Sequence, residues 1–133
     1  MRIFLDTNVL VSAFAARGLS TDVFELVRVR HELVTGRAVL VELERALRVK
    51  VKLPPDRCTE IVAFVSSEAV LVVGGAKTVD CNADAEDRLV LGEAIEGQAD
   101  LFVTGDAAVV SLGKLGAMQI LTPRQLWERL SER

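Results

Sequence analysis

Short apolar runs alternate along the chain with longer segments in which apolar residues recur every three or four positions. Continuous apolar runs predict buried strands, and the three-to-four spacing predicts helices with one buried face. The predicted strands are Arg2–Leu5, Glu32–Thr35, Ala69–Val73, Leu101–Val103 and Met118–Leu121. The predicted helices are Asn8–Ala16, a second beginning at Ser20-Thr21-Asp22, Ala38–Val49, one from the Leu53-Pro54-Pro55-Asp56 break to about Ser66, Ala85–Glu96, and a last beginning at Thr122-Pro123.

Polar residues, glycines and prolines mark the ends of these elements. Asn8 and the Ser20-Thr21-Asp22 group are good helix-capping residues, and Pro123 occupies a first helical turn, where proline is favoured. Gly74-Gly75 ends the third predicted strand. Strands that alternate with helices predict an α/β fold: a central, mostly parallel sheet with right-handed crossovers and helices on both faces. The 133 residues contain no repeat and no long linker, so we expect one domain over residues 1–133.

Composition narrows the class of protein. Half of the residues are hydrophobic and 26% are charged, which is typical of a soluble globular protein. Cys58 and Cys81 lack the spacing of a zinc site and read as free thiols of a reducing compartment. Asp6 and Asn8 interrupt the first apolar stretch, so a secretory signal fits poorly, and no apolar run is long enough for a membrane helix. We therefore expect a cytoplasmic protein.

Charge is unevenly distributed. The net charge of −3 and the pI near 5.2 argue against a protein that coats nucleic acid by bulk positive charge, but not against a nuclease. Residues 28–57 contain eight Lys or Arg residues and only four acidic residues. This excess could bind phosphates, with Arg45, Arg48 and Lys50 as candidates. The alternative, equally weighted, is a pair of solvated helix faces.

Two aspartates follow predicted strands in the same way. Asp6 ends the stretch IFLD, and Asp106 ends LFVTGD after Thr104. The carboxyl ends of parallel strands meet at one edge of a sheet, where function collects. Taken alone, the Asp6-Thr7-Asn8 stretch before a helix reads as a cap more often than as a catalytic group.

Two further acids lie on helical stretches. Asp87 precedes Val90, Leu91, Ala94 and Ile95 at helical spacing, which places it on the stripe expected to face the core. A charge there is costly unless it is paired or binds a metal, although acids also favour the first helical turn. Glu42 borders the apolar side of its helix and is, by itself, more typical of a surface residue or a partner of Arg.

Four converging carboxylates would repel one another strongly, and a divalent cation would relieve that repulsion. Mg²⁺ and Mn²⁺ prefer oxygen ligands, and one or two such ions can activate water and stabilise a phosphodiester transition state. Zinc fits less well, because His31 is the only histidine and the cysteines are poorly placed. These residue types predict hydrolysis of a phosphodiester bond.

The motifs FLDTNVLVSA, VELERAL, DAEDRLVLGEA, ADLFVTGD and ILTPRQLWERL span nearly the whole chain. Together they resemble the PIN-domain family, and in particular its bacterial and archaeal toxin group of VapC-like ribonucleases. The resemblance makes Asp6, Glu42, Asp87 and Asp106 the catalytic and metal-binding quartet. It makes Asn8, Thr104 and Asp84 supporting residues. The family's acidic stretch usually reads D-P-D-D, whereas residues 84–87 read DAED, so only the outer charge pattern differs.

The resemblance also implies metal-dependent cleavage of RNA, a homodimer and inhibition by a small antitoxin. A phosphatase of the haloacid dehalogenase type would need a second Asp where Asn8 stands. A receiver domain would need an acidic pair after its first strand. The stronger alternative is a catalytically silent PIN-like module that binds RNA or a protein.

Overall fold

The computed structural model describes residues 1–72 and 79–131 and contains a six-stranded sheet of order β3-β2-β1-β4-β6-β5. All neighbouring strands are parallel except β5 and β6. The strands are β1 (Arg2–Leu5), β2 (Glu32–Gly36), β3 (Val70–Val72), β4 (Leu101–Val103), β5 (Lys114–Leu115) and β6 (Met118–Leu121). The predicted α/β class is confirmed. Of the third predicted strand, the end at Val73 and the Gly74-Gly75 stop lie outside the described residues.

The helices agree with the predicted order, with shifts at their ends. They are α1 (Thr7–Ala15), α2 (Leu19–Arg30), α3 (Arg37–Val49), α4 (Pro55–Glu68), α5 (Ala85–Glu96), α6 (Ala107–Val110) and α7 (Pro123–Ser131). Neither α6 nor β5 was predicted, because four and two residues are too short to show a period.

Two predicted helix caps are wrong. Helix α1 is capped by Asp6 instead of Asn8, which lies inside its first turn. Helix α2 begins after Gly18, ahead of Ser20-Thr21-Asp22, and no side chain caps it. The Thr21 hydroxyl, instead of capping α2, donates to the carbonyl oxygens of Ala13 and Ala16.

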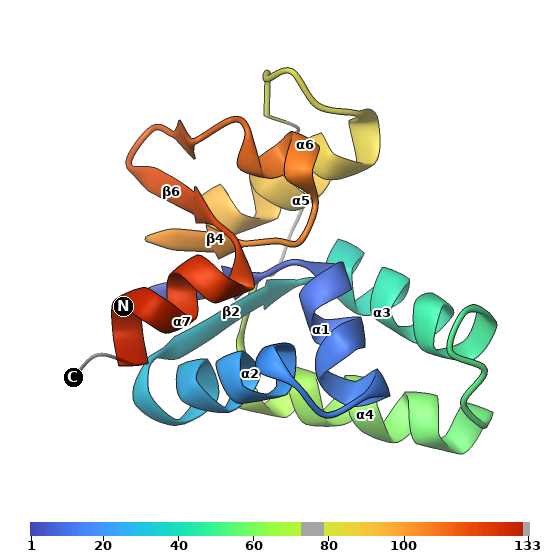
Figure 1. Cartoon of the computed structure of the whole chain (residues 1–133). Coiled ribbons are helices and arrows are strands. Elements are labelled where there is room, and N and C mark those ends of the chain that lie inside the picture. The colour runs from blue at the N-terminus through green and yellow to red at the C-terminus, as the bar shows by residue number, and fades with distance from the viewer. Residues whose placement is uncertain (73–78, 132–133) are drawn as a thin grey trace.

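The order of the strands explains why helices cover both faces of the sheet. The steps from β1 to β2 and from β2 to β3 run toward the same edge, so right-handed crossovers place α1–α4 on one side. The step from β3 to β4 runs back across the sheet and places α5 on the other side, where it packs against β2 and β3. Figure 1 shows α2 and α4 below β2, with α5 and α6 above it. In the described residues, no helix has the length and apolar character needed to cross a membrane.

The central strands carry the core. Phe4 of β1 pairs with Phe102 of β4 in register, and their rings stack with centroids 5.4 Å apart. Both rings are almost entirely removed from water. Such burial contributes roughly 1.5–3 kcal/mol per large apolar side chain, so the β1–β4 pair is a rigid base for the residues that follow these two strands.

Candidate active site at the carboxyl edge of the sheet

The register of β1 and β4 places Asp6 and Thr104 next to each other. Leu5 pairs with Val103, and the backbone N–H of Asp6 donates to the Val103 carbonyl at 2.9 Å. Both strands then end, and their next side chains are buried: Asp6 is 8% exposed and Thr104 is 0% exposed. The predicted meeting of two strand ends is therefore present in the structure.

A hydrogen-bond network holds Asp6 in one orientation. Its Oδ2 accepts from Thr104 Oγ1 at 2.8 Å and from Asn8 Nδ2 at 3.1 Å, while its Oδ1 accepts from the Thr7 N–H at 2.8 Å. Asn8 Oδ1 accepts from the Gly105 N–H at 2.8 Å, and Thr104 Oγ1 accepts from the Asp106 N–H at 3.0 Å. Asn8 and Thr104 thus position Asp6 and the turn that carries Asp106.

Three of the aspartates also cap helices, and each does so through Oδ1. Asp6 caps α1, Asp84 caps α5 by accepting from the Asp87 N–H at 2.9 Å, and Asp106 caps α6 by accepting from the Ala108 N–H at 2.9 Å. A carboxylate has about four lone-pair sites, so capping leaves acceptor capacity on Oδ2 of Asp84 and Asp106, whereas Asp6, whose Oδ2 already accepts two hydrogen bonds, keeps capacity on Oδ1. Capping and a role in a site, which the sequence left as alternatives for Asp6, are therefore compatible.

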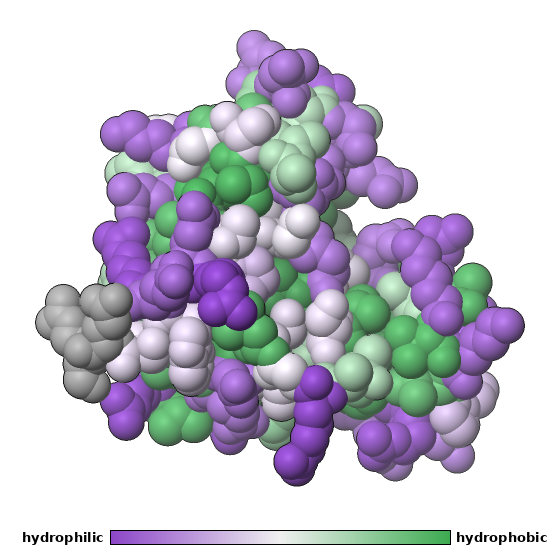
Figure 2. Space-filling model, viewed as in Figure 1, coloured by the Kyte–Doolittle hydropathy of each residue, from purple (hydrophilic) through white to green (hydrophobic). Residues whose placement is uncertain are grey.

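One cleft, with a volume of about 380 Å³, is lined by all four predicted acids: Asp6, Glu42, Asp87 and Asp106. It lies between the strand ends, α1, α3 and α5. The space-filling view shows the surface hollowed between the part formed by α5 and α6 and the part formed by α3, with hydrophilic side chains on both rims (Figure 2).

The acids of the cleft repel one another. Burial, followed by repulsion from Asp84, Asp6 and Asp106, raises the pKa of Asp87 to about 6. Burial also raises the pKa of Asp6, against the hydrogen bonds from Thr104, Thr7 and Asn8. Among the described residues, no ion pair relieves Asp6, Asp87 or Asp106. The cleft therefore holds excess negative charge at neutral pH.

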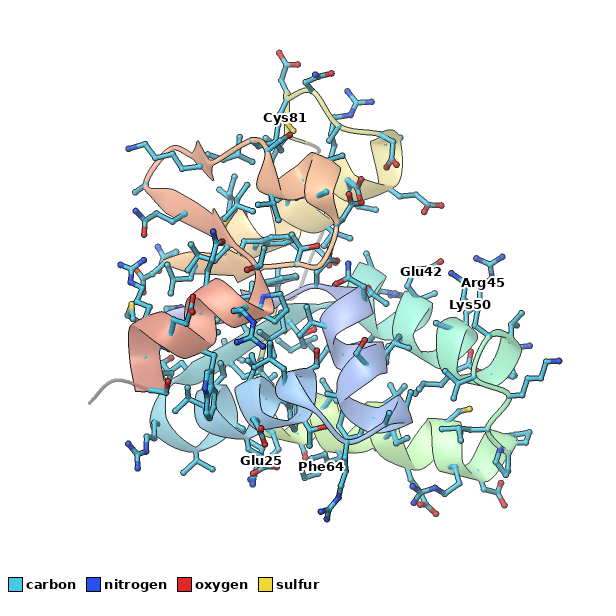
Figure 3. All side chains as sticks on the ribbon, viewed as in Figure 1. Glu25, Glu42, Arg45, Lys50, Phe64 and Cys81 are labelled. Atoms are coloured by element: carbon cyan, nitrogen blue, oxygen red, sulfur yellow. The ribbon has the colours of Figure 1, made fainter. Side chains whose placement is uncertain are left out.

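Glu42 is placed differently from the aspartates. Its Oε1 accepts from Arg45 Nη1 at 3.3 Å, one turn along α3, and its side chain is 37% exposed. Figure 3 shows Glu42, Arg45 and Lys50 along one side of α3. Of the three candidate phosphate-binding residues only Lys50 lines the cleft, since Arg45 is held by Glu42 and Arg48 donates to Glu44 at 2.9 Å.

Asp87 was predicted to lie on the stripe of α5 that faces the core, and the structure places it at the border of that stripe, half-buried. Val90, Leu91 and Ala94 of α5 are buried as expected, whereas Ile95 is 42% exposed, so the predicted stripe is one residue too wide.

Ser12 and Glu86 also line the cleft and were not predicted. Ser12 lies four residues after Asn8 on α1, so helical spacing was the available signal.

The donor set suits a hard divalent cation, because the cleft offers carboxylate oxygens and no side chain that the structure describes forms an ion pair with the aspartates. In the described part of the chain, however, no three His, Cys, Asp or Glu side chains lie close enough to form a ready-made metal centre. The four acids thus line one cleft without forming a closely grouped set of ligands, and Glu42 is in addition paired with Arg45 through Oε1.

Comparison with known proteins supplies the family. A family model described as PIN domain matches residues 2–108. The chain belongs to the PIN-domain family, as its motifs predicted. Proteins with this domain are generally nucleases.

A solved structure, VapBC2 from Rickettsia felis bound to a DNA fragment from its promoter, contains a similar chain, with a TM-score of 0.63 and 14% identity. The alignment covers 92% of this chain and 98% of that one, and at this identity it supports the fold alone. A search of curated proteins finds no significant match.

Proposed function

We propose that residues 1–133 form one nuclease domain that hydrolyses RNA with the help of one or two Mg²⁺ or Mn²⁺ ions. Asp6, Asp87 and Asp106 would hold the metal, and Glu42 would ligate it or orient the attacking water. The observation that supports this proposal is the convergence of four carboxylates on one cleft, where no cation of residues 1–72 and 79–131 forms an ion pair with the three aspartates. A binding surface for RNA phosphates gains nothing from such repulsion.

The chain's own residues would divide the work by position. Thr104 and Asn8 hold Asp6 rigidly, so its free acceptor sites point in a fixed direction. Glu42, once released from Arg45, could take a proton from water at a carboxylate oxygen. A bound divalent ion would supply the positive charge that lowers the pKa of water and stabilises the phosphodiester transition state. Lys50 would bind a neighbouring phosphate at the rim.

The direct test is cleavage of several RNAs by purified protein with Mg²⁺, with Mn²⁺ and with EDTA. Hydrolysis by activated water should leave a 5′-phosphate and a 3′-hydroxyl, and it does not need the RNA 2′-hydroxyl. Products with a 2′,3′-cyclic phosphate, or equal rates with EDTA, would contradict the proposal. A DNA of the same sequence tests whether the 2′-hydroxyl contributes to recognition.

A second candidate is the catalytically silent module. The ion pair between Glu42 and Arg45 favours it, as does the lack of three closely grouped acids among the described residues. Calorimetric titration with Mn²⁺ beside the cleavage assay separates the two functions. Tight binding of Mn²⁺ without cleavage of any RNA would support the silent module.

We further propose that the protein is a cytoplasmic toxin that forms a homodimer and is inhibited by a small antitoxin. Support comes from the PIN family and from the similarity to a chain of the VapBC2 complex. A short reading frame beside the gene, whose product binds this protein and stops cleavage, is the expected finding. Size-exclusion chromatography with light scattering measures the oligomeric state.

A further inference from the structure

Helix α3 starts without a cap of its own. Its N-cap residue is Gly36, which has no side chain, and its first turn contains no acid. The first backbone N–H groups of a helix have no partner within the helix and need acceptors from elsewhere. The start of α3 is partly buried: Gly36 and Val39 are buried, Ala38 is half-buried and Arg37 is exposed.

Glu93 of α5 supplies the missing acceptor. Its Oε2 accepts from the Ala38 N–H at 2.8 Å. The residue is 6% exposed, and burial raises the pKa of its carboxyl group against the opposing effect of the backbone N–H groups of Ala38 and Val39. A carboxylate at a helix N-terminus is further stabilised by the helix dipole. Glu93 therefore acts as the cap of a helix other than its own.

Gly36 leaves the space that this carboxylate occupies. A Cβ atom at Gly36 would lie 2.3 Å from Glu93 Oε1, closer than any real contact. The backbone of Gly36 has φ of −140°, which any residue adopts, so conformational freedom does not explain the glycine. The close approach of the Glu93 carboxylate explains why a glycine stands at position 36. Gly36 leaves the space and Glu93 fills it with the hydrogen-bond acceptor for α3, so the two residues act as one unit.

This unit joins the two helices that bring acids to the cleft. Helix α5 carries Asp87, six residues before Glu93, and α3 carries Glu42, four residues after Ala38. We propose that Glu93 is a positioning residue that fixes α3 against α5 and so sets Glu42 and Lys50 relative to Asp87. The inference rests on the proposed nuclease function for its kinetic consequence, but the tie between the helices is independent of that function.

Two substitutions separate the capping bond from simple filling of space. Glu93→Gln keeps an acceptor oxygen at the same reach, whereas Glu93→Leu fills a similar volume without an acceptor. Gly36→Ala displaces the carboxylate from the other side and replaces Glu93→Leu if that variant does not fold. The matched control is Glu68→Leu: Glu68 also ties two helices, accepting from Arg28 of α2 at 2.6 Å, but neither α2 nor α4 lines the cleft.

Kinetics at a temperature at which every variant is folded give the first readout. We expect Glu93→Leu to lower kcat roughly 10- to 100-fold, while Glu93→Gln and Glu68→Leu keep the wild-type kcat. In a double-mutant cycle with Glu42→Ala, the effect of Glu93→Leu should largely disappear, because both act through the same carboxylate. A wild-type kcat in Glu93→Leu, or effects that multiply in the cycle, would overturn the proposal.

NMR of the metal-free protein gives a second readout that needs no activity. Glu93→Leu should shift amide signals along α3 as far as Lys50 and speed hydrogen exchange at Ala38 and Val39, whereas Glu93→Gln should do neither. Changes confined to Ala38 and Val39 would overturn the positioning role. If the wild-type protein cleaves no RNA, the nuclease proposal fails, and this NMR result still decides whether Glu93 sets the position of α3.

Discussion

The two sides of the acidic cleft are built in different ways. Asp6 and Asp106 follow the central strands β1 and β4, and their turns are joined by the hydroxyl of Thr104 and the amide of Asn8. Glu42 and Asp87 lie on helices, and within the described part of the chain neither side chain accepts a hydrogen bond from the strand side. A hydrogen-bonded strand edge therefore faces a helical side whose acids are held by local contacts alone.

This difference between the strand side and the helical side indicates which acids of the cleft can change position more easily. Moving Asp6 would break three hydrogen bonds to its carboxylate, one of them buried and two partly buried, and a buried group left without its partner is costly. Moving Glu42 costs only a largely exposed ion pair, of the kind that contributes about 0–1 kcal/mol. The strand-side acids are thus the more firmly held part of the cleft, so, under the proposed function, substitutions on the strand side should have the larger effects.

The largest expected effect comes from the strand-edge acids. Asp6→Asn and Asp106→Asn keep the shape of the side chain but remove its charge, and each should lower kcat by about 1,000-fold or more. Circular dichroism should show a nearly unchanged fold. Asp56→Asn, which changes an exposed acid of α4, is the control. A freshly purified Asp6 variant that cuts RNA at the wild-type rate would remove Asp6 from the site.

Thr104 tests the network behind those acids. Thr104→Val is nearly isosteric and removes a hydroxyl that joins Asp6, Asn8 and Asp106, so we expect a loss of roughly 10- to 100-fold in activity or metal affinity. Unfolding should become easier by about 1–3 kcal/mol, as expected for buried groups left unpaired. Thr35→Val is the matched control, because the buried Thr35 hydroxyl has no partner among the described residues. Equal losses of activity and of stability in Thr104→Val and Thr35→Val would show that the hydrogen bonds of Thr104 do not support the site.

Asp87 should make metal-free stability depend on pH. Its pKa is raised from 3.8 to about 6, so the folded protein keeps a proton that the unfolded chain has lost. The contribution of the Asp87 carboxyl group to the free energy of unfolding is therefore fully present below about pH 4 and is lost as the pH rises toward 6. With EDTA at about pH 7.5, Asp87→Asn should raise Tm by a few degrees.

Adding Mn²⁺ should make the Tm of the wild type higher than that of Asp87→Asn, because the ion stabilises only the protein with an intact ligand set. Thermal melts of both proteins, with and without the ion, check this crossing. If Mn²⁺ raises Tm equally in wild type and Asp87→Asn, Asp87 does not bind the metal.

The smallest expected effect is on RNA binding and comes from Lys50 at the rim of the cleft. Lys50→Ala should weaken RNA binding modestly and reduce the slope of log affinity against log salt by about one. Arg48→Ala, on the same helix but paired with Glu44 outside the cleft, should leave that slope nearly unchanged. Fluorescence anisotropy at several salt concentrations measures both. Equal slopes for the two variants would remove Lys50 from the binding surface.

Sequence patterns predicted most of this architecture because continuous apolar runs and helical periodicity are local signals. β1, β4, β6 and α5 have the predicted bounds, and Asp6 and Asp106 were found from the strands that precede them. Glu93 was missed, although an acid inside the apolar stretch LVLGEAI was a visible signal of a buried role. Its partner, the start of α3, lies 55 residues away in sequence, so only the packing of α5 against β2 could reveal it.

The hydrogen bond between Asp6 and Thr104 joins residues that are 98 positions apart. During synthesis at roughly 5–20 residues per second, β4 leaves the ribosome several seconds after β1. Until then Asp6 has neither its Thr104 partner nor its neighbour Asp106, and the acidic cleft does not exist. Because β1 and β4 are neighbours in the sheet but far apart in the sequence, the first acid of the cluster is synthesised well before the residues that complete the site.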